Sequence, residues 1–137
     1  MIDNLLEIRN LSVEYHTDDA VIYAVNNIHL SIKKGETMGL VGETGAGKTT
    51  IAKSVLRVLQ TPPARLVSGE IFYQGEDLLK LSEREMRKIR GNKIAMIFQE
   101  PMTSLNPVFT VGNQIEEVFA LHQKEIRFYY QSLFLPL

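Results

Sequence analysis

The chain has 137 residues, of which 45% are hydrophobic and 23% charged, and its formal net charge is −1. This length and balance predict a single soluble globular domain, and the near-neutral charge gives no basic footprint for binding nucleic acid. Because the sequence contains no cysteine, disulfides, thiolate zinc sites, iron–sulfur clusters and cysteine nucleophiles are excluded.

Two alternating segments open the chain and predict two strands. From Leu5 to Tyr15 apolar and polar residues alternate, and a break in phase at Asn10-Leu11 indicates a bulge. After a polar turn, the segment from Val21 to Ile32 resumes the alternation. The two segments are therefore each expected to form a strand.

Tyr15 stands at the end of the first expected strand. An aromatic ring there can stack on a purine, a contact worth roughly 1–3 kcal/mol per base. The alternative is an aromatic side chain that only packs on the sheet, and Tyr23 is a weaker candidate for the same stacking role.

A glycine-rich loop follows at residues 42–49 and fits the phosphate-binding pattern of Gly, four residues, then Gly-Lys-Ser/Thr. The apolar run 37–41 before it predicts a buried strand, and the apolar spacing of residues 50–59 predicts a helix. Strand, glycine loop and helix form the arrangement that this motif requires.

The chemistry of the loop follows from its backbone. Glycines permit positive φ and a close approach of polyphosphate, while N–H groups at a helix start attract anions. Lys48 is expected to reach the β- and γ-phosphates, and the Thr49 hydroxyl to bind Mg²⁺. A turn that binds nothing is the alternative, but it would not need Lys-Thr at this offset. The residues expected to bind nucleotide here are Gly42, Glu43, Thr44, Gly45, Ala46, Gly47, Lys48, Thr49 and Thr50.

The second half of the chain predicts shorter elements. Thr61-Pro62-Pro63 ends the helix, and residues 69–77 predict a short strand and turn. Ser82 and Glu85 have capping-box spacing and open a helix that extends to about Arg90. Residues 93–98 predict a second mostly apolar strand, and Thr110 is expected to cap a helix with an apolar stripe.

Gln99 lies where this second apolar strand is expected to end, just before Pro101. Its amide oxygen can ligate Mg²⁺ or hold a water molecule. The alternative is an ordinary polar residue at a strand end.

The glycine loop, the upstream aromatic and the run from Ile97 to Pro107 together resemble the ATP-binding subunits of ABC transporters. The last run resembles the Q-loop region of the oligopeptide/dipeptide (and nickel) importer branch, and the resemblance covers about residues 5–123. It implies an α/β fold of the P-loop NTPase (ABC ATPase) type. The part present would be an antiparallel N-terminal β-subdomain plus an incomplete parallel-sheet core with flanking helices.

The resemblance also implies roles for individual residues. Tyr15 corresponds to the A-loop aromatic on adenine, residues 42–50 to the Walker A loop, and Gln99 to the Q-loop glutamine that contacts metal and water. The implied cofactors are ATP and Mg²⁺, with Thr49 and Gln99 as metal ligands. The implied partners are transmembrane permease subunits and a second ATP-binding subunit, at the cytoplasmic face of the cell membrane.

Motifs that complete such an ATPase are missing. No signature loop, Walker B strand or switch histidine is found, and the last aspartate is Asp77, upstream of Gln99. Residues 1–125 are therefore interpreted as a partial ABC ATP-binding domain, truncated before the signature and Walker B motifs. Residues 126–137 are interpreted as an atypical apolar tail outside the family fold. Without a Walker B strand beside it, the strand at 37–41 is expected to have an unpaired edge.

The expected function is that of the ATP-binding part of a peptide importer. Whether this chain hydrolyses ATP is left open, and its own rate of ATP hydrolysis is expected to be very low. The alternative is a hydrolysis-incompetent truncation product that binds nucleotide and has no transport role. A frame change or premature stop near Lys124 would produce such a product, and a genuine short paralogue is the competing explanation. A GTPase fits less well, because Asn92-Lys93 is not followed by the aspartate of a guanine-reading motif.

Overall fold

The computed structural model describes residues 4–99 and 105–122. It divides into two compact units, the first ending at Met86 and the second beginning at Arg87. The expected tail at 126–137 lies outside the described residues. The elements are β1 (Asn4–His16), β2 (Val21–Lys33), α1 (Lys48–Val55), β3 (Ala64–Tyr73), β4 (Glu76–Asp77), α2 (Glu83–Ile89) and α3 (Val111–His122).

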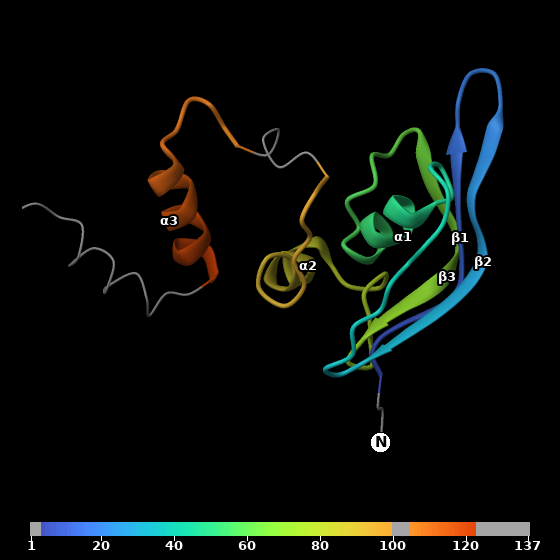
Figure 1. Cartoon of the computed structure of the whole chain (residues 1–137), viewed down its shortest axis with the longest axis horizontal. Helices are drawn as coiled ribbons and strands as arrows, with labels where there is room; N and C mark the ends of the chain where they lie inside the picture. Colours follow the sequence, from blue (N-terminus) through green and yellow to red (C-terminus); the bar gives the residue numbers. More distant parts are fainter. Residues whose placement is uncertain (1–3, 100–104, 123–137) are drawn as a thin grey trace, which may run out of the picture. The chain divides into compact units, whose positions relative to one another are not determined.

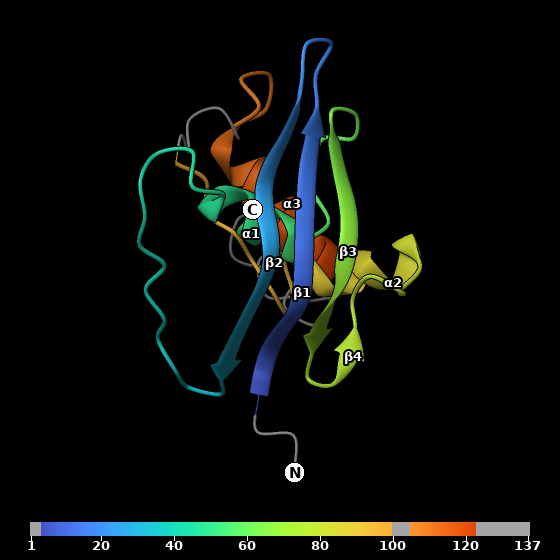
Figure 2. The same cartoon turned by 90° about the vertical axis from the view of Figure 1, so that its right-hand side faces the viewer.

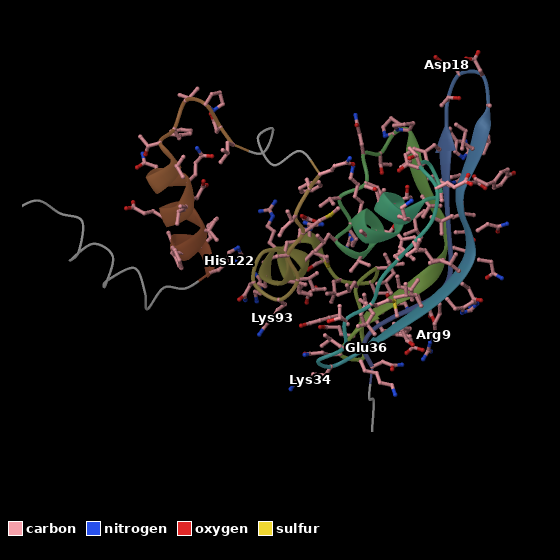
Figure 3. All side chains as sticks on the ribbon, viewed as in Figure 1. Arg9, Asp18, Lys34, Glu36, Lys93 and His122 are labelled. Carbon is pink, nitrogen blue, oxygen red and sulfur yellow. The ribbon has the colours of Figure 1, made fainter. Side chains whose placement is uncertain are left out.

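The first unit contains an antiparallel sheet of four strands in the order β2-β1-β3-β4. β1 is central and pairs with β2 on one side and β3 on the other, while α1 lies against one face of the sheet (Figures 1 and 2). Asp18 lies at the turn between β1 and β2, and Lys34 and Glu36 lie in the turn after β2 (Figure 3). The two strands predicted from alternation are therefore confirmed, as an antiparallel hairpin.

The core of the first unit forms where the inward residues of the sheet meet α1 and the segment after β4. Alternation along β1 buries one face because successive side chains on a strand point to opposite sides. The buried apolar residues of this unit are Ile8, Leu11, Val13, Val25, Val55, Leu56, Ala64, Ile71, Leu78 and Met86.

The predicted bulge at Asn10 is confirmed and is matched on both neighbouring strands. Asn10 has φ 50°, Asn27 on β2 has φ 48° and Gly69 on β3 has φ 116°, all in the left-handed region. The β1–β2 register shifts between Ile8 and Leu11. Side chains hold the irregularity, since the Asn27 N–H donates to Ser12 Oγ at 2.9 Å. The regular pairing is therefore interrupted on all three strands near Asn10, as expected at a bulge.

The prediction of a strand at residues 37–41 is wrong, because the structure forms no strand there. The segment has no strand pairing, and Val41 is 93% exposed. Figure 2 shows the chain between β2 and α1 running outside the four-stranded sheet. A strand in a parallel sheet forms hydrogen bonds with neighbouring strands, and no strand among the described residues pairs with this segment.

The strand predicted at residues 93–98 is also wrong. Its one pairing is an isolated bridge between Arg90 and Ile94, and Ile97 is 92% exposed. The apolar sequence indicates a buried strand, but burial requires neighbouring strands that the described part of the second unit does not contain.

The helix predicted at residues 50–59 is confirmed in kind but differs in extent, since α1 begins at Lys48 and ends at Val55. It ends before the prolines because Arg57 adopts a left-handed conformation with φ 53°. The Arg57 guanidinium donates to the carbonyls of Leu78 at 3.2 Å and Leu81 at 2.7 Å. This arginine therefore ties the end of α1 to the segment that leads into α2.

The two predicted helix caps are confirmed. The Ser82 N–H donates to the Glu85 carboxylate at 2.8 Å, and the Glu85 N–H donates to Ser82 Oγ at 3.4 Å, which is the reciprocal capping box. At α3, the Asn113 N–H donates to Thr110 Oγ1 at 3.3 Å. The described part of α3 has no buried residue, so its apolar stripe is uncovered within the second unit.

Candidate nucleotide-binding site

The loop before α1 is shaped by two glycines with left-handed backbone. Gly45 has φ 86° and Gly47 has φ 78°, and between them the Ala46 N–H donates to the Glu43 carbonyl at 3.2 Å. Gly47 is the N-cap of α1 and provides no side-chain cap. The two glycines therefore let the backbone make a tight turn into α1, and no side chain caps the N-terminus of this helix.

The backbone amides at this helix start are free to bind a ligand. Among the described residues, no acceptor pairs with the N–H groups of Gly45, Gly47, Lys48 and Thr49. The N-terminus of a helix carries roughly half a positive charge, and its orphan N–H groups point outward along the axis. This part of the chain has the chemistry of an anion site, as the glycine pattern predicts.

Lys48 lies folded over the same loop. Its ammonium donates to the carbonyls of Gly42 at 2.6 Å and Glu43 at 2.5 Å. The two carbonyls hold the positive charge beside the free amides without neutralising it. A polyphosphate can take over these contacts as a stronger, charged acceptor.

Strand β2 supports the loop from behind. A Cβ placed on Gly47 would lie 2.2 Å from the Ala24 carbonyl oxygen and 3.2 Å from Val25 Cγ2. Backbone cannot yield as a flexible side chain can, so glycine is the one residue type that fits here.

Tyr15 is brought to the first turn of α1. Its hydroxyl lies 3.3 Å from Thr50 Oγ1, within hydrogen-bond distance, although the two residues are 35 positions apart in the chain. Thr50 is buried, and its carbonyl accepts from Ser54 Oγ at 2.7 Å. The structure therefore places the predicted aromatic next to the predicted phosphate loop.

One residue beside Tyr15 was missed from sequence. Ile22 pairs directly with Tyr15 across the β1–β2 ladder, so the two side chains share a face of the sheet, and Ile22 is 54% exposed. Tyr23 pairs with Glu14 and so lies on the opposite face, away from α1. The strand register, which the sequence does not show, favours Ile22 over Tyr23 as a companion to Tyr15.

The two predicted metal ligands, Thr49 and Gln99, lie in different units of the structure. Thr49 is exposed next to the free amides, and Gln99 is an exposed residue of the second unit. Their shared contact with a metal stays a prediction. In the described ranges no cluster of three or more His, Asp or Glu side chains is arranged to hold a metal ion.

Comparison with known proteins decides the family. The profile of the family described as "ABC transporter" matches residues 25–133. The chain belongs to the ABC transporter family. The resemblance found from the glycine loop and the run around Gln99 is thereby confirmed.

Two curated relatives of this chain are named as ATP-binding proteins of peptide transport. It is 47% identical over 125 residues to a probable peptide ABC transporter ATP-binding protein of Sinorhizobium fredii, covering 91% of this chain and 37% of that protein. It is 42% identical to the oligopeptide transport ATP-binding protein OppD of Bacillus subtilis, covering 90% of this chain and 34% of that one. The chain thus spans about a third of the length of these relatives.

Solved structures with a similar fold are ATP-binding cassettes. One, bound to ADP and Pi in a dimeric post-hydrolysis state, matches with a TM-score of 0.71 and 27% identity. The match covers 84% of this chain and 47% of that one. The expected fold class, the N-terminal part of an ABC ATPase with an antiparallel β-subdomain, is confirmed. The chain is an ABC ATP-binding sequence that is similar to ATP-binding proteins named for peptide transport. Within the described ranges, no helix is both long and apolar enough to cross a bilayer.

Proposed function

We propose that this chain binds MgATP through residues 42–50 as the nucleotide-binding part of a peptide importer's ATP-binding subunit. The observation that carries the proposal is the group of free amides at the start of α1, together with the Lys48 ammonium, which donates to the loop carbonyls of Gly42 and Glu43. The ADP-bound cassette of similar fold and the peptide-transport names of the relatives support it.

Each loop residue has a chemical role in this proposal. The amides of residues 45 and 47–49 bind phosphate oxygens, and the Lys48 side chain neutralises charge on the β- and γ-phosphates. Mg²⁺ prefers oxygen ligands and keeps several waters, so the exposed Thr49 hydroxyl beside a phosphate suits it without a carboxylate cage. Gln99 is proposed as a further oxygen ligand.

The nucleobase is proposed to lie on the surface formed by Tyr15 and Ile22. The two residues are paired across β1 and β2, on the face of the sheet that carries α1. An aromatic ring with an apolar neighbour offers a stacking surface that does not distinguish strongly among bases.

The partners and location are part of the same proposal. A permease would use the bound nucleotide to drive transport, a second ATP-binding subunit would complete the pair, and the chain would lie on the cytoplasmic face of the membrane. The similar cassette solved as a dimer is consistent with this assembly.

Replacing Lys48 by alanine is expected to weaken MgATP binding at least about tenfold, because a charge-assisted hydrogen bond contributes roughly 1.5–3 kcal/mol. Isothermal titration of the purified chain with MgATP measures the effect. Lys53→Ala is the matched control, since it removes the same charge from the last turn of the same helix. Equal dissociation constants for wild type and Lys48→Ala would show that the loop is not a working nucleotide site.

We expect the 137-residue chain to hydrolyse ATP no faster than the background rate, even at saturating MgATP. No aspartate follows Asp77, so no Walker B carboxylate is present to hold the metal and the attacking water. A coupled phosphate assay on wild type and Lys48→Ala tests this, and turnover that disappears in Lys48→Ala would contradict it. Binding without turnover is also what the alternative function, a nucleotide-binding product with no transport role, requires.

A further inference from the structure

The first turn of α1 is fixed to the sheet at two points. Gly47 rests on the Ala24 carbonyl of β2, close enough that a Cβ would lie 2.2 Å from its oxygen. One turn further along, Thr50 meets the Tyr15 hydroxyl of β1 at 3.3 Å. Residues 48 and 49, whose amides face the proposed phosphate site, lie between these two points.

The contact at Thr50 is specific to a hydroxyl. Thr50 is only 8% exposed, and its carbonyl is held by Ser54 Oγ at 2.7 Å, so the residue has little freedom to move. Its own hydroxyl has the Tyr15 hydroxyl as its partner. Phenylalanine at position 15 would keep the ring but would leave the Thr50 hydroxyl without that partner.

We propose that Tyr15 is a positioning residue for phosphate binding, which acts through its hydroxyl on Thr50, in addition to offering its ring to a base. The inference rests on the proposed nucleotide-binding function. By holding the second point of the first turn, the hydroxyl keeps the amides of Lys48 and Thr49 aimed at a common centre. Oriented donors are what make a helix start bind polyphosphate well.

The two proposed roles of Tyr15 can be distinguished by comparing a ligand that has a base with one that has none. Stacking needs a base and therefore affects MgATP only. Positioning affects every ligand that places phosphates on the loop, including magnesium tripolyphosphate, which has no base. The hydroxyl role and the ring role thus predict different patterns across the two ligands.

The experiment measures dissociation constants of MgATP and magnesium tripolyphosphate by isothermal titration for wild type, Tyr15→Phe, Thr50→Val, Thr50→Ser and the double variant Tyr15→Phe/Thr50→Val. Tyr15→Phe is expected to weaken both ligands by the same factor, about threefold to tenfold, the range for one hydrogen bond. Thr50→Ser restores the hydroxyl that Thr50→Val lacks, so it should bind both ligands more tightly than Thr50→Val. The double variant should be no weaker than Thr50→Val alone, because both changes remove one bond.

Tyr23→Phe is the matched control, since it removes a hydroxyl from the opposite face of the neighbouring strand and should change neither constant. Far-ultraviolet circular dichroism confirms that each variant keeps its fold. The proposal is overturned if Tyr15→Phe binds both ligands like wild type, weakens MgATP alone, or adds its full effect to that of Thr50→Val. Failure of the wild type itself to bind MgATP would instead overturn the proposed function.

Discussion

Gly47→Ala should abolish nucleotide binding, because the new methyl group has no space behind the loop. Its Cβ would lie 2.2 Å from the Ala24 carbonyl oxygen, a distance that only a backbone shift can relieve. The shift would turn the amides of residues 47 and 48 away from the phosphates. Losing two charge-assisted hydrogen bonds, each worth roughly 1.5–3 kcal/mol, raises the dissociation constant at least about a hundredfold.

Gly45→Ala is the control that isolates the clash. Gly45 has nearly the same backbone conformation, φ 86° against 78°, but no atom lies within 4 Å of a Cβ placed on it. Both variants therefore carry left-handed strain of about 1–2 kcal/mol, and only Gly47→Ala adds the collision with β2. Isothermal titration with MgATP compares them. Equal loss in the two variants would mean that strain alone governs the loop and that β2 does not support it.

The sequence predicts those parts of this fold whose causes lie close together in the chain. Alternation over a dozen residues decides which face of β1 is buried, and the Ser82–Glu85 capping box closes within three residues. The glycine loop is also recognised locally, since its two left-handed glycines at 45 and 47 and its lysine at 48 lie within four residues. Such features need no knowledge of distant segments.

The two wrong strand predictions have one physical origin. Residues 37–41 and 93–98 have the apolar composition of strands buried inside a parallel sheet, and composition is all that a sequence pattern detects. Strand structure also needs hydrogen-bonded neighbours, and among the described residues these segments have only the isolated bridge at Ile94. Val41 and Ile97 therefore remain exposed.

The contacts between α1 and the rest of the first unit also could not be predicted. The Tyr15–Thr50 contact joins positions 35 apart, and the Arg57 bonds to Leu78 and Leu81 span 21 and 24 positions. Ile22 becomes a candidate contact for the base only once the β1–β2 register is known. Each of these follows from pairing across the sheet, and an alternating pattern does not specify that pairing to the residue.

Gly69→Ala should destabilise the first unit by roughly 3 kcal/mol or more. Gly69 has φ 116°, and a Cβ on it would lie 2.6 Å from Leu11 Cα and 2.9 Å from both Asn10 O and Leu11 N. All three are backbone atoms of β1, at the bulge where the β1–β3 register shifts between Arg9 and Ser12. Left-handed strain and overpacking each contribute about 1–3 kcal/mol, and both act at this position.

The measurement is urea unfolding followed by circular dichroism, with Gly35→Ala as the matched control. Gly35 has φ 79° in an open turn, and no atom lies within 4 Å of the place that its methyl group would take, so its replacement carries strain without contact. Gly69→Ala should lower the unfolding midpoint far more than the control, since small domains have only about 5–15 kcal/mol of stability to lose. The effect concentrates at Gly69 because β1 is the strand that every other long strand of the sheet pairs with, and Leu11, which the methyl group would displace, is fully buried at its centre. Similar midpoints for the two variants would mean that β1 and β3 can separate at the bulge at little cost, which would contradict the tight backbone approach seen here.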